Sequence, residues 1–91
     1  MVVYNIIEIY EPHNSDINFN VCTYTDLDKA KARLKREVSK MKNYWFKTEP
    51  DGYQYCEELE YENIDKNGME YSCCTEREDY FSICIEETKV I

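Results

Sequence analysis

A single histidine is the residue that invites a catalytic interpretation. His13 stands beside Ser15 and Asp16 in the run from Pro12 to Asp16. A Ser-His-Asp triad needs residues that the fold brings together around an oxyanion hole, and three neighbours in one turn do not supply that arrangement. We therefore interpret His13 as a turn residue. No other residue set converges in the sequence, and we expect no enzyme activity.

Five cysteines raise the question of a metal site: Cys22, Cys56, Cys73, Cys74 and Cys84. Zinc ligands usually come as pairs spaced C-x2-4-C, because that turn directs two sulfurs at one centre. The only close pair here is adjacent, and neighbouring residues on a strand point to opposite faces. We predict no metal and no cofactor. An odd cysteine count also argues against a complete disulfide set, so we expect free thiols in a reducing cytoplasm.

The carboxylates predict a binding surface. Nineteen acids against eleven bases give a formal charge of −8. Glu58, Glu60 and Glu62 alternate with apolar residues, a pattern typical of a half-buried strand with an acidic ridge. Their neighbours in the sequence extend the candidate acidic surface, which comprises Glu57, Glu58, Glu60, Glu62, Glu76, Glu78 and Asp79. Whether this surface imitates the phosphates of nucleic acid stays open.

The bases are concentrated elsewhere, because residues 26–47 hold eight of the eleven. The rest of the chain is strongly acidic, so we do not expect direct binding to nucleic acid. Met1 to Tyr10 has no basic start, and Asn5 and Glu8 interrupt its apolar run. It therefore resembles neither a signal peptide nor a membrane span, and we expect a cytoplasmic location without membrane contact.

Three periodic segments open the chain. Val2–Tyr10 and Ile17–Tyr24 are rich in β-branched and aromatic residues, and the turn composition between them predicts an antiparallel hairpin. Both sides of the first strand are largely apolar, which favours a place inside the sheet. Thr25 is a suitable N-cap for a helix of about five turns. Its apolar stripe consists of Leu27, Ala30, Leu34, Val38, Met41 and Trp45.

The second half of the chain predicts three more strands. An alternating segment runs from Tyr53 to Glu62, Asp65–Gly68 forms a hairpin turn, Met69–Thr75 returns, and Tyr80–Glu87 follows another turn. The order is ββαβββ. We expect an α+β fold in a single domain of residues 1–91. It consists of one antiparallel sheet of about five strands with one long amphipathic helix packed on one face.

One helix covers only one face of a sheet, so the other face should be open. With Phe81, Ile83 and Ile85 facing one way, the opposite set should form this face: Tyr4, Ile6, Tyr10, Cys22, Tyr24, Cys74 and Cys84. Such an aromatic, uncharged surface predicts an interface, either with a protein partner or with a second copy in a homodimer. The alternative, that loops cover it, and the strand order both stay open.

The segments Val2–Tyr10, Thr23–Val38 and Tyr80–Glu87 are similar to small acidic α+β proteins of bacteriophages and mobile elements. The likeness covers about a third of the chain and implies no catalytic residues. It implies a protein that binds and blocks a host protein. Our leading hypothesis is accordingly a non-enzymatic binding protein that inhibits or regulates a host protein through the acidic surface and the open face. The alternative is a small-molecule domain whose open-face tyrosines stack on a nucleotide-like ligand.

Overall fold

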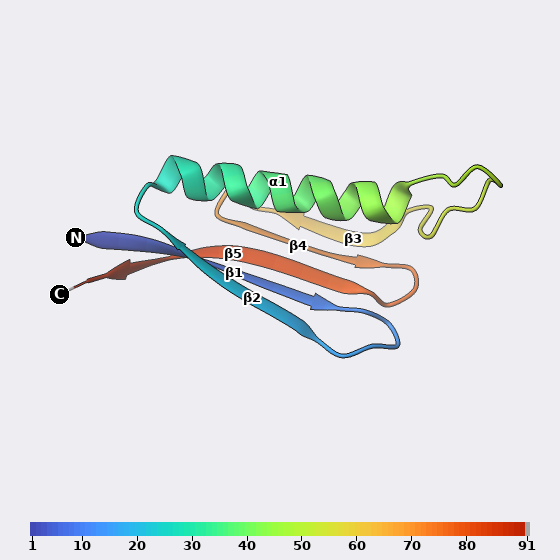
Figure 1. The fold of residues 1–91 in the computed structure, drawn as a ribbon, viewed down its shortest axis with the longest axis horizontal. Helices are drawn as coiled ribbons and strands as arrows, with labels where there is room; N and C mark the ends of the chain where they lie inside the picture. The colour runs from blue at the N-terminus through green and yellow to red at the C-terminus, as the bar shows by residue number, and fades with distance from the viewer. Residues whose placement is uncertain (91) are drawn as a thin grey trace.

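The computed structural model describes residues 1–90 and shows an α+β fold with the predicted order ββαβββ. Five antiparallel strands form one sheet, and one helix lies along one of its faces (Figure 1). The elements are β1 (Val2–Glu11), β2 (Asn18–Tyr24), α1 (Leu27–Phe46), β3 (Leu59–Ile64), β4 (Glu70–Thr75) and β5 (Tyr80–Lys89).

The strand order is β2-β1-β5-β4-β3, so the last strand of the chain lies at the centre of the sheet. The interior position expected for β1 is confirmed, because β1 pairs with β2 on one side and with β5 on the other. Strands β2 and β3 are the two edges. The pairing of β1 with β5 joins the two ends of the chain, and the backbone N–H of Val90 donates to the carbonyl of Met1.

The helix begins one residue later than Thr25 predicts. Its N-cap is Asp26, whose carboxylate accepts the backbone N–H groups of Asp28 at 2.8 Å and Lys29 at 3.3 Å. Aspartate caps as well as threonine does and adds a negative charge at the positive end of the helix dipole. At the other end, the loop 47–58 supplies donors to the last carbonyls, since Cys56 N–H bonds to Trp45 and the Gln54 amide to Phe46.

The core lies between α1 and the face of the sheet that it covers. Ala30, Leu34 and Trp45 are buried on the helix side. The strands contribute buried side chains from β1, β4 and β5, namely Ile6, Tyr71, Cys73, Phe81, Ile83 and Ile85. The predicted apolar stripe therefore packs as expected. Trp45 is fully buried and its ring lies 6.1 Å from that of Tyr10.

The β3–β4 hairpin turn is confirmed at Asp65–Gly68. The N–H of Gly68 donates to the carbonyl of Asp65, and Gly68 has a φ of 74°, a left-handed conformation that glycine adopts without steric cost. The strand before it is shorter than the alternation from Tyr53 predicts. It begins at Leu59 and its register shifts between Leu59 and Tyr61. The preceding residues form a loop that extends past the end of α1 (Figure 1).

Candidate functional site

The register of the strands decides which side chains remain free on the face away from α1. Ile6 pairs with Ile85 and Tyr10 with Phe81, so even positions of β1 share a face with odd positions of β5. The buried members of these pairs lie against the helix, and Tyr10 packs against the same core. The opposite face, which we call the open face, carries the odd positions of β1 and the even positions of β5.

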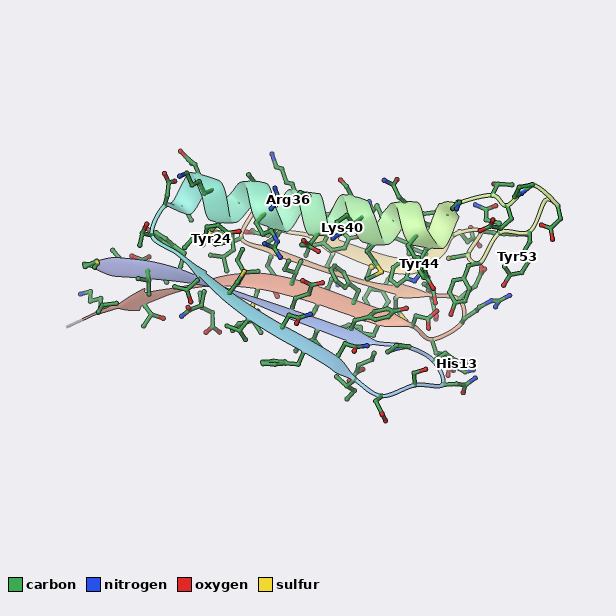
Figure 2. The ribbon with its side chains drawn as sticks, in the orientation of Figure 1. His13, Tyr24, Arg36, Lys40, Tyr44 and Tyr53 are labelled. Carbon is green, nitrogen blue, oxygen red and sulfur yellow. The ribbon has the colours of Figure 1, made fainter. Side chains whose placement is uncertain are left out.

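Most of the residues predicted for the open face lie on the face that α1 covers, so that prediction is wrong for them. Ile6 is 2% exposed in the core, and four more pack against it from the covered face: Tyr4, Tyr10, Cys22 and Tyr24. Figure 2 shows Tyr24 between the sheet and α1, where its hydroxyl oxygen accepts a hydrogen bond from Arg33. The prediction holds only for Cys74 and Cys84, because these residues pair with Tyr80 and Ile7 on the open face.

The open face has an apolar half on β1 and β2. Ile9 pairs with Phe19 and Ile7 with Val21, so these four side chains form one block across two neighbouring strands. Phe19 is 61% exposed and Val21 is 53% exposed. We call this block the apolar patch. The sequence does not indicate this patch, because Ile17–Tyr24 is more apolar at its odd positions, which is the usual sign of the buried side.

The other half of the open face is acidic. At strand positions on this face every charged residue is a glutamate: Glu70 on β4 and Glu86 on β5 lie in this half, and Glu11 lies at the end of β1. Burial, and then the charges of Glu86 and Glu70, raise the pKa of the Cys84 thiol. Burial, followed by the charges of Glu60, Asp79 and Glu78, raises the pKa of Cys74.

The predicted acidic surface is divided by the fold. Asp79 is completely buried, so its inclusion in that surface is wrong. Glu62 lies beside α1, where Lys42 approaches it at 2.6 Å and the hydroxyl of Tyr71 donates to it. These contacts, the lysine first, lower the pKa of Glu62. Four of the remaining acids lie near the ends of the strands, namely Glu57, Glu58, Glu76 and Glu78. The Glu57 N–H donates to the Glu76 carboxylate.

The ridge expected along Glu58, Glu60 and Glu62 does not form. Glu58 precedes β3, Glu60 stands at the register shift, and Glu62 is bound on the helix side. Glu58 and Glu60 are exposed, whereas the Glu62 side chain is 28% exposed. A continuous row of carboxylates at regular spacing is therefore missing from the described part of this strand.

The histidine and the cysteines are not arranged for catalysis. His13 is exposed in the β1–β2 turn, 3.7 Å from Glu78 (Figure 2). The five cysteines are free thiols. The raised pKa values of Cys56, Cys73, Cys74 and Cys84 keep these sulfurs protonated, which disfavours thiolate chemistry.

Two further kinds of feature are absent from residues 1–90. No group of three or more His, Cys, Asp or Glu side chains is placed there to hold a metal ion. No helix in this range has the length and hydropathy of a membrane span. Neither family models, nor curated proteins, nor solved structures match this chain.

Proposed function

We propose that this protein is a non-enzymatic binding module that docks a protein partner on its open face. One observation carries the proposal: an exposed apolar patch adjoins strands whose charged open-face positions are all acidic. Apolar surface supplies most of the free energy of protein association, and surrounding charges set the choice of partner. This arrangement brings an apolar and an acidic surface together on one side of the sheet, with residues largely different from those predicted.

The charges define the chemistry of the partner. A surface with an apolar centre and lysine or arginine beside it complements the patch and the neighbouring glutamates. A second copy docked face to face is less suitable, because it brings Glu70 and Glu86 of one molecule toward the acidic half of the other. We therefore propose that the partner is a protein of different sequence whose binding surface has a basic rim.

The edge strand next to the patch offers a second means of contact. Strand β2 reads NFNVCTY and contains no charged residue and no proline, the devices that usually protect an edge strand. Its outer backbone groups are free to pair with an extended segment of the partner. The resemblance to phage and mobile-element proteins favours a host protein as that partner, with inhibition or regulation as the outcome.

In the experiment, wild type and variants are immobilised and exposed to an extract of cells that encode this chain. The proteins that each of them captures are then compared. Phe19→Ser with Val21→Ser removes exposed apolar area, and Glu86→Lys reverses a charge on the open face. Tyr53→Ser and Glu49→Lys are the controls, because both residues are exposed in the loop 47–58. We expect one basic protein to be retained by wild type and both controls and lost from both open-face variants. Equal retention by all five proteins would contradict the proposal.

The small-molecule alternative loses its original basis. It placed a nucleotide-like ligand on open-face tyrosines, whereas Tyr4, Tyr10 and Tyr24 pack toward the helix. The open face keeps Tyr61 and Tyr80, which flank Cys74 on β3 and β5. Neither ring lines any of the four main pockets, so we do not place a nucleotide there.

A further inference from the structure

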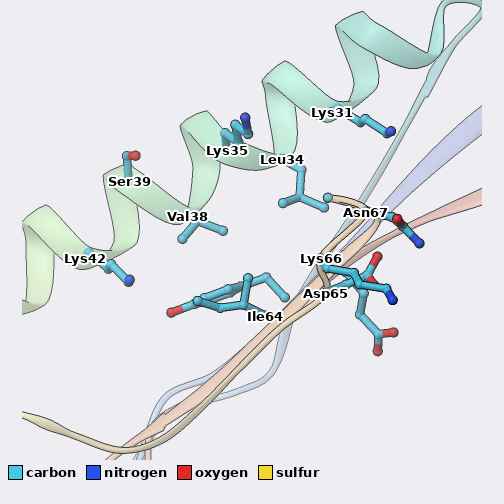
Figure 3. A pocket seen from close by; sticks show the side chains of 13 residues that line it. Lys31, Leu34, Lys35, Val38, Ser39, Lys42, Ile64, Asp65, Lys66 and Asn67 are labelled. Atoms are coloured by element: carbon cyan, nitrogen blue, oxygen red, sulfur yellow. The ribbon is translucent and has the colours of Figure 1, made fainter.

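A cleft opens on the other side of the sheet, between α1 and the β3–β4 hairpin. It has a volume of about 560 Å³, which is within the range of sites for small organic ligands. The cleft exists because α1 packs mainly on β1, β2 and β5, so the hairpin stands apart as a separate wall. Figure 3 shows Leu34 and Val38 directed from the helix toward that wall.

The inner lining is apolar and mostly aliphatic. Leu34 is 5% exposed and forms part of the floor together with Val38. Ile64 lies on the hairpin wall and is 68% exposed, although the edge strand gives no other reason for a large apolar side chain there. An alkyl chain in the cleft would remove Ile64 from water and contact aliphatic groups on both walls.

The rim is basic. Lys31, Lys35 and Lys42 come from α1, and Lys66 comes from the tip of the hairpin. Lys42 is already paired with Glu62, whereas the other three lysines form no ion pair within residues 1–90.

Two acids also line the cleft, but they do not cancel the lysines. The Asp65 carboxylate accepts the N–H of Met69 within its own turn, and Glu70 pairs in the strand with Cys84 on the open face. Apart from the Lys42–Glu62 pair, three lysines therefore face two acids, and these three lysines form no ion pair within residues 1–90. An anionic group at this rim would be attracted from both walls of the cleft.

We propose that the cleft binds an alkyl chain with an anionic head group, of which a free medium-chain fatty acid is the simplest source. The aliphatic lining selects the chain, and Lys31, Lys35 and Lys66 hold the head group. A nucleotide fits less well, because the one aromatic ring of the cleft, Tyr71, is only 4% exposed and its hydroxyl is bound to Glu62. No aromatic face is thus free to stack on a base.

The test is calorimetric titration of the whole protein with decanoate below its micelle concentration. Octyl glucoside serves as a neutral alkyl ligand and adenosine monophosphate as a nucleotide. We expect decanoate to bind at least about tenfold more tightly than either. Equal binding of octyl glucoside would overturn the role of the lysines, and tighter binding of the nucleotide would overturn the ligand class. Absence of decanoate binding at millimolar concentration would overturn the proposal.

Variants locate the binding. Lys31→Gln with Lys35→Gln should weaken decanoate about tenfold, because two cations leave the rim. The matched control, Lys29→Gln with Arg36→Gln, removes the same charge from exposed positions of α1 that do not line the cleft. Ile64→Ser should weaken decanoate without loss of folding, since the side chain is already exposed. Equal affinities in the lysine variant and its control would refute the site.

Two more measurements separate sources and sites. Phosphatidylglycerol vesicles present the same chemistry in a bilayer, and cosedimentation with them in the absence of decanoate binding would contradict a free fatty acid. The open-face variant with Phe19→Ser and Val21→Ser should bind decanoate as wild type does, because that patch lies on the opposite side of the sheet. Loss of decanoate binding in this variant would place the ligand on the open face instead.

Discussion

Asp79 is a carboxylate that the fold uses internally. It accepts the N–H of His13 at 2.7 Å, the hydroxyl of Tyr55 at 2.7 Å and the hydroxyl of Thr75 at 3.0 Å. These donors come from the β1–β2 turn, the loop 47–58 and the end of β4. Burial and the bond to Asp79 raise the pKa of Tyr55, so its hydroxyl stays a donor over the physiological range. One side chain thereby joins two connecting segments to the end of β4.

Replacing Asp79 should be costly. Asp79→Ala leaves three donors without their acceptor, and we expect a loss of about 2–4 kcal/mol in the free energy of unfolding. Urea denaturation measures the loss. Glu78→Ala is the neighbouring control, because the Glu78 side chain is 82% exposed and should be dispensable. Similar stabilities for the two variants would show that Asp79 does not link the segments as described.

Two glutamates on the helix side should respond to acid in opposite directions. Lys42 and Tyr71 lower the pKa of Glu62 below 4.5, so its stabilising effect is present above pH 4.5 and is lost as pH falls through its folded-state pKa. Burial, and then the charge of Glu37, raise the pKa of Glu8 above 4.5, so ionised Glu8 destabilises the folded state.

Unfolding measured between neutral and acidic pH checks this pair. Glu62→Gln should lower the free energy of unfolding at pH 7, and the difference from wild type should vanish in acid. Glu8→Gln should raise the free energy of unfolding at pH 7, and its advantage should disappear as pH falls toward 4.5. A change of the same sign in both variants at pH 7 would contradict these assignments.

At the scale of elements, the helix is defined by its cap and by the loop that follows it. Asp26 satisfies two of the free N–H groups in the first turn. The loop 47–58 returns to satisfy carbonyls at the other end, which also buries Cys56. Both ends of α1 are thus held, and its apolar stripe keeps one orientation on the sheet.

The two candidate caps can be separated by substitution. Asp26→Ala should cost about 1 kcal/mol in the free energy of unfolding, because the first-turn N–H groups lose their acceptor. Thr25→Ala should cost clearly less, since Thr25 is exposed and lies outside the cap position. Thermal and urea denaturation of both variants measure the difference. A larger loss at Thr25 would restore the cap that the sequence first suggests.

At the scale of the whole molecule, charge is separated between the two layers. The outer helix carries seven bases against two acids, whereas the charged strand positions on the open face are acidic. Two copies can therefore meet in two ways. When two open faces meet, their apolar patches come into contact but their glutamates repel one another. When the helix of one copy meets the open face of another, opposite charges attract.

Sedimentation velocity at low and high salt distinguishes the two contacts. Salt screens the repulsion between glutamates, so weak face-to-face association should increase with salt and should be absent from the variant with Phe19→Ser and Val21→Ser. Association that instead weakens with salt and survives in this variant would indicate helix-to-sheet contact. That contact is not closed by a twofold axis and would lead to larger assemblies.

Much of this architecture can be predicted from local pattern. The stripe from Leu27 to Trp45 has helical spacing, the Asp65–Gly68 turn contains Asn-Gly, and the strands alternate or are rich in β-branched residues. The exact helix cap and the first residue of β3 were harder to predict from the sequence. Thr25 and Asp26 are both good caps, and the register shift beside Leu59 interrupts an alternation that looks continuous in the sequence.

The candidate sites were harder to predict than the elements. The alternating glutamates correctly indicate a strand, but they say nothing of Lys42, whose approach to Glu62 takes that carboxylate away from the free surface. The cleft has no signal in the sequence at all. Lys31 and Lys66 are far apart along the chain and come together only because α1 lies beside the hairpin.

Periodicity, turns and caps depend on neighbours a few residues apart, so the elements, their order and the need for one uncovered sheet face can be inferred from the chain alone. Which side chains occupy that face depends on contacts between distant strands. Ile6 pairs with Ile85, a residue that is separated from it by most of the chain. Because side chains alternate between the faces of a strand, a shift of one residue in this pairing would exchange the two faces of β1. The packing of the buried set under α1 selects one of the two registers, and that selection leaves Phe19 and Val21 in water.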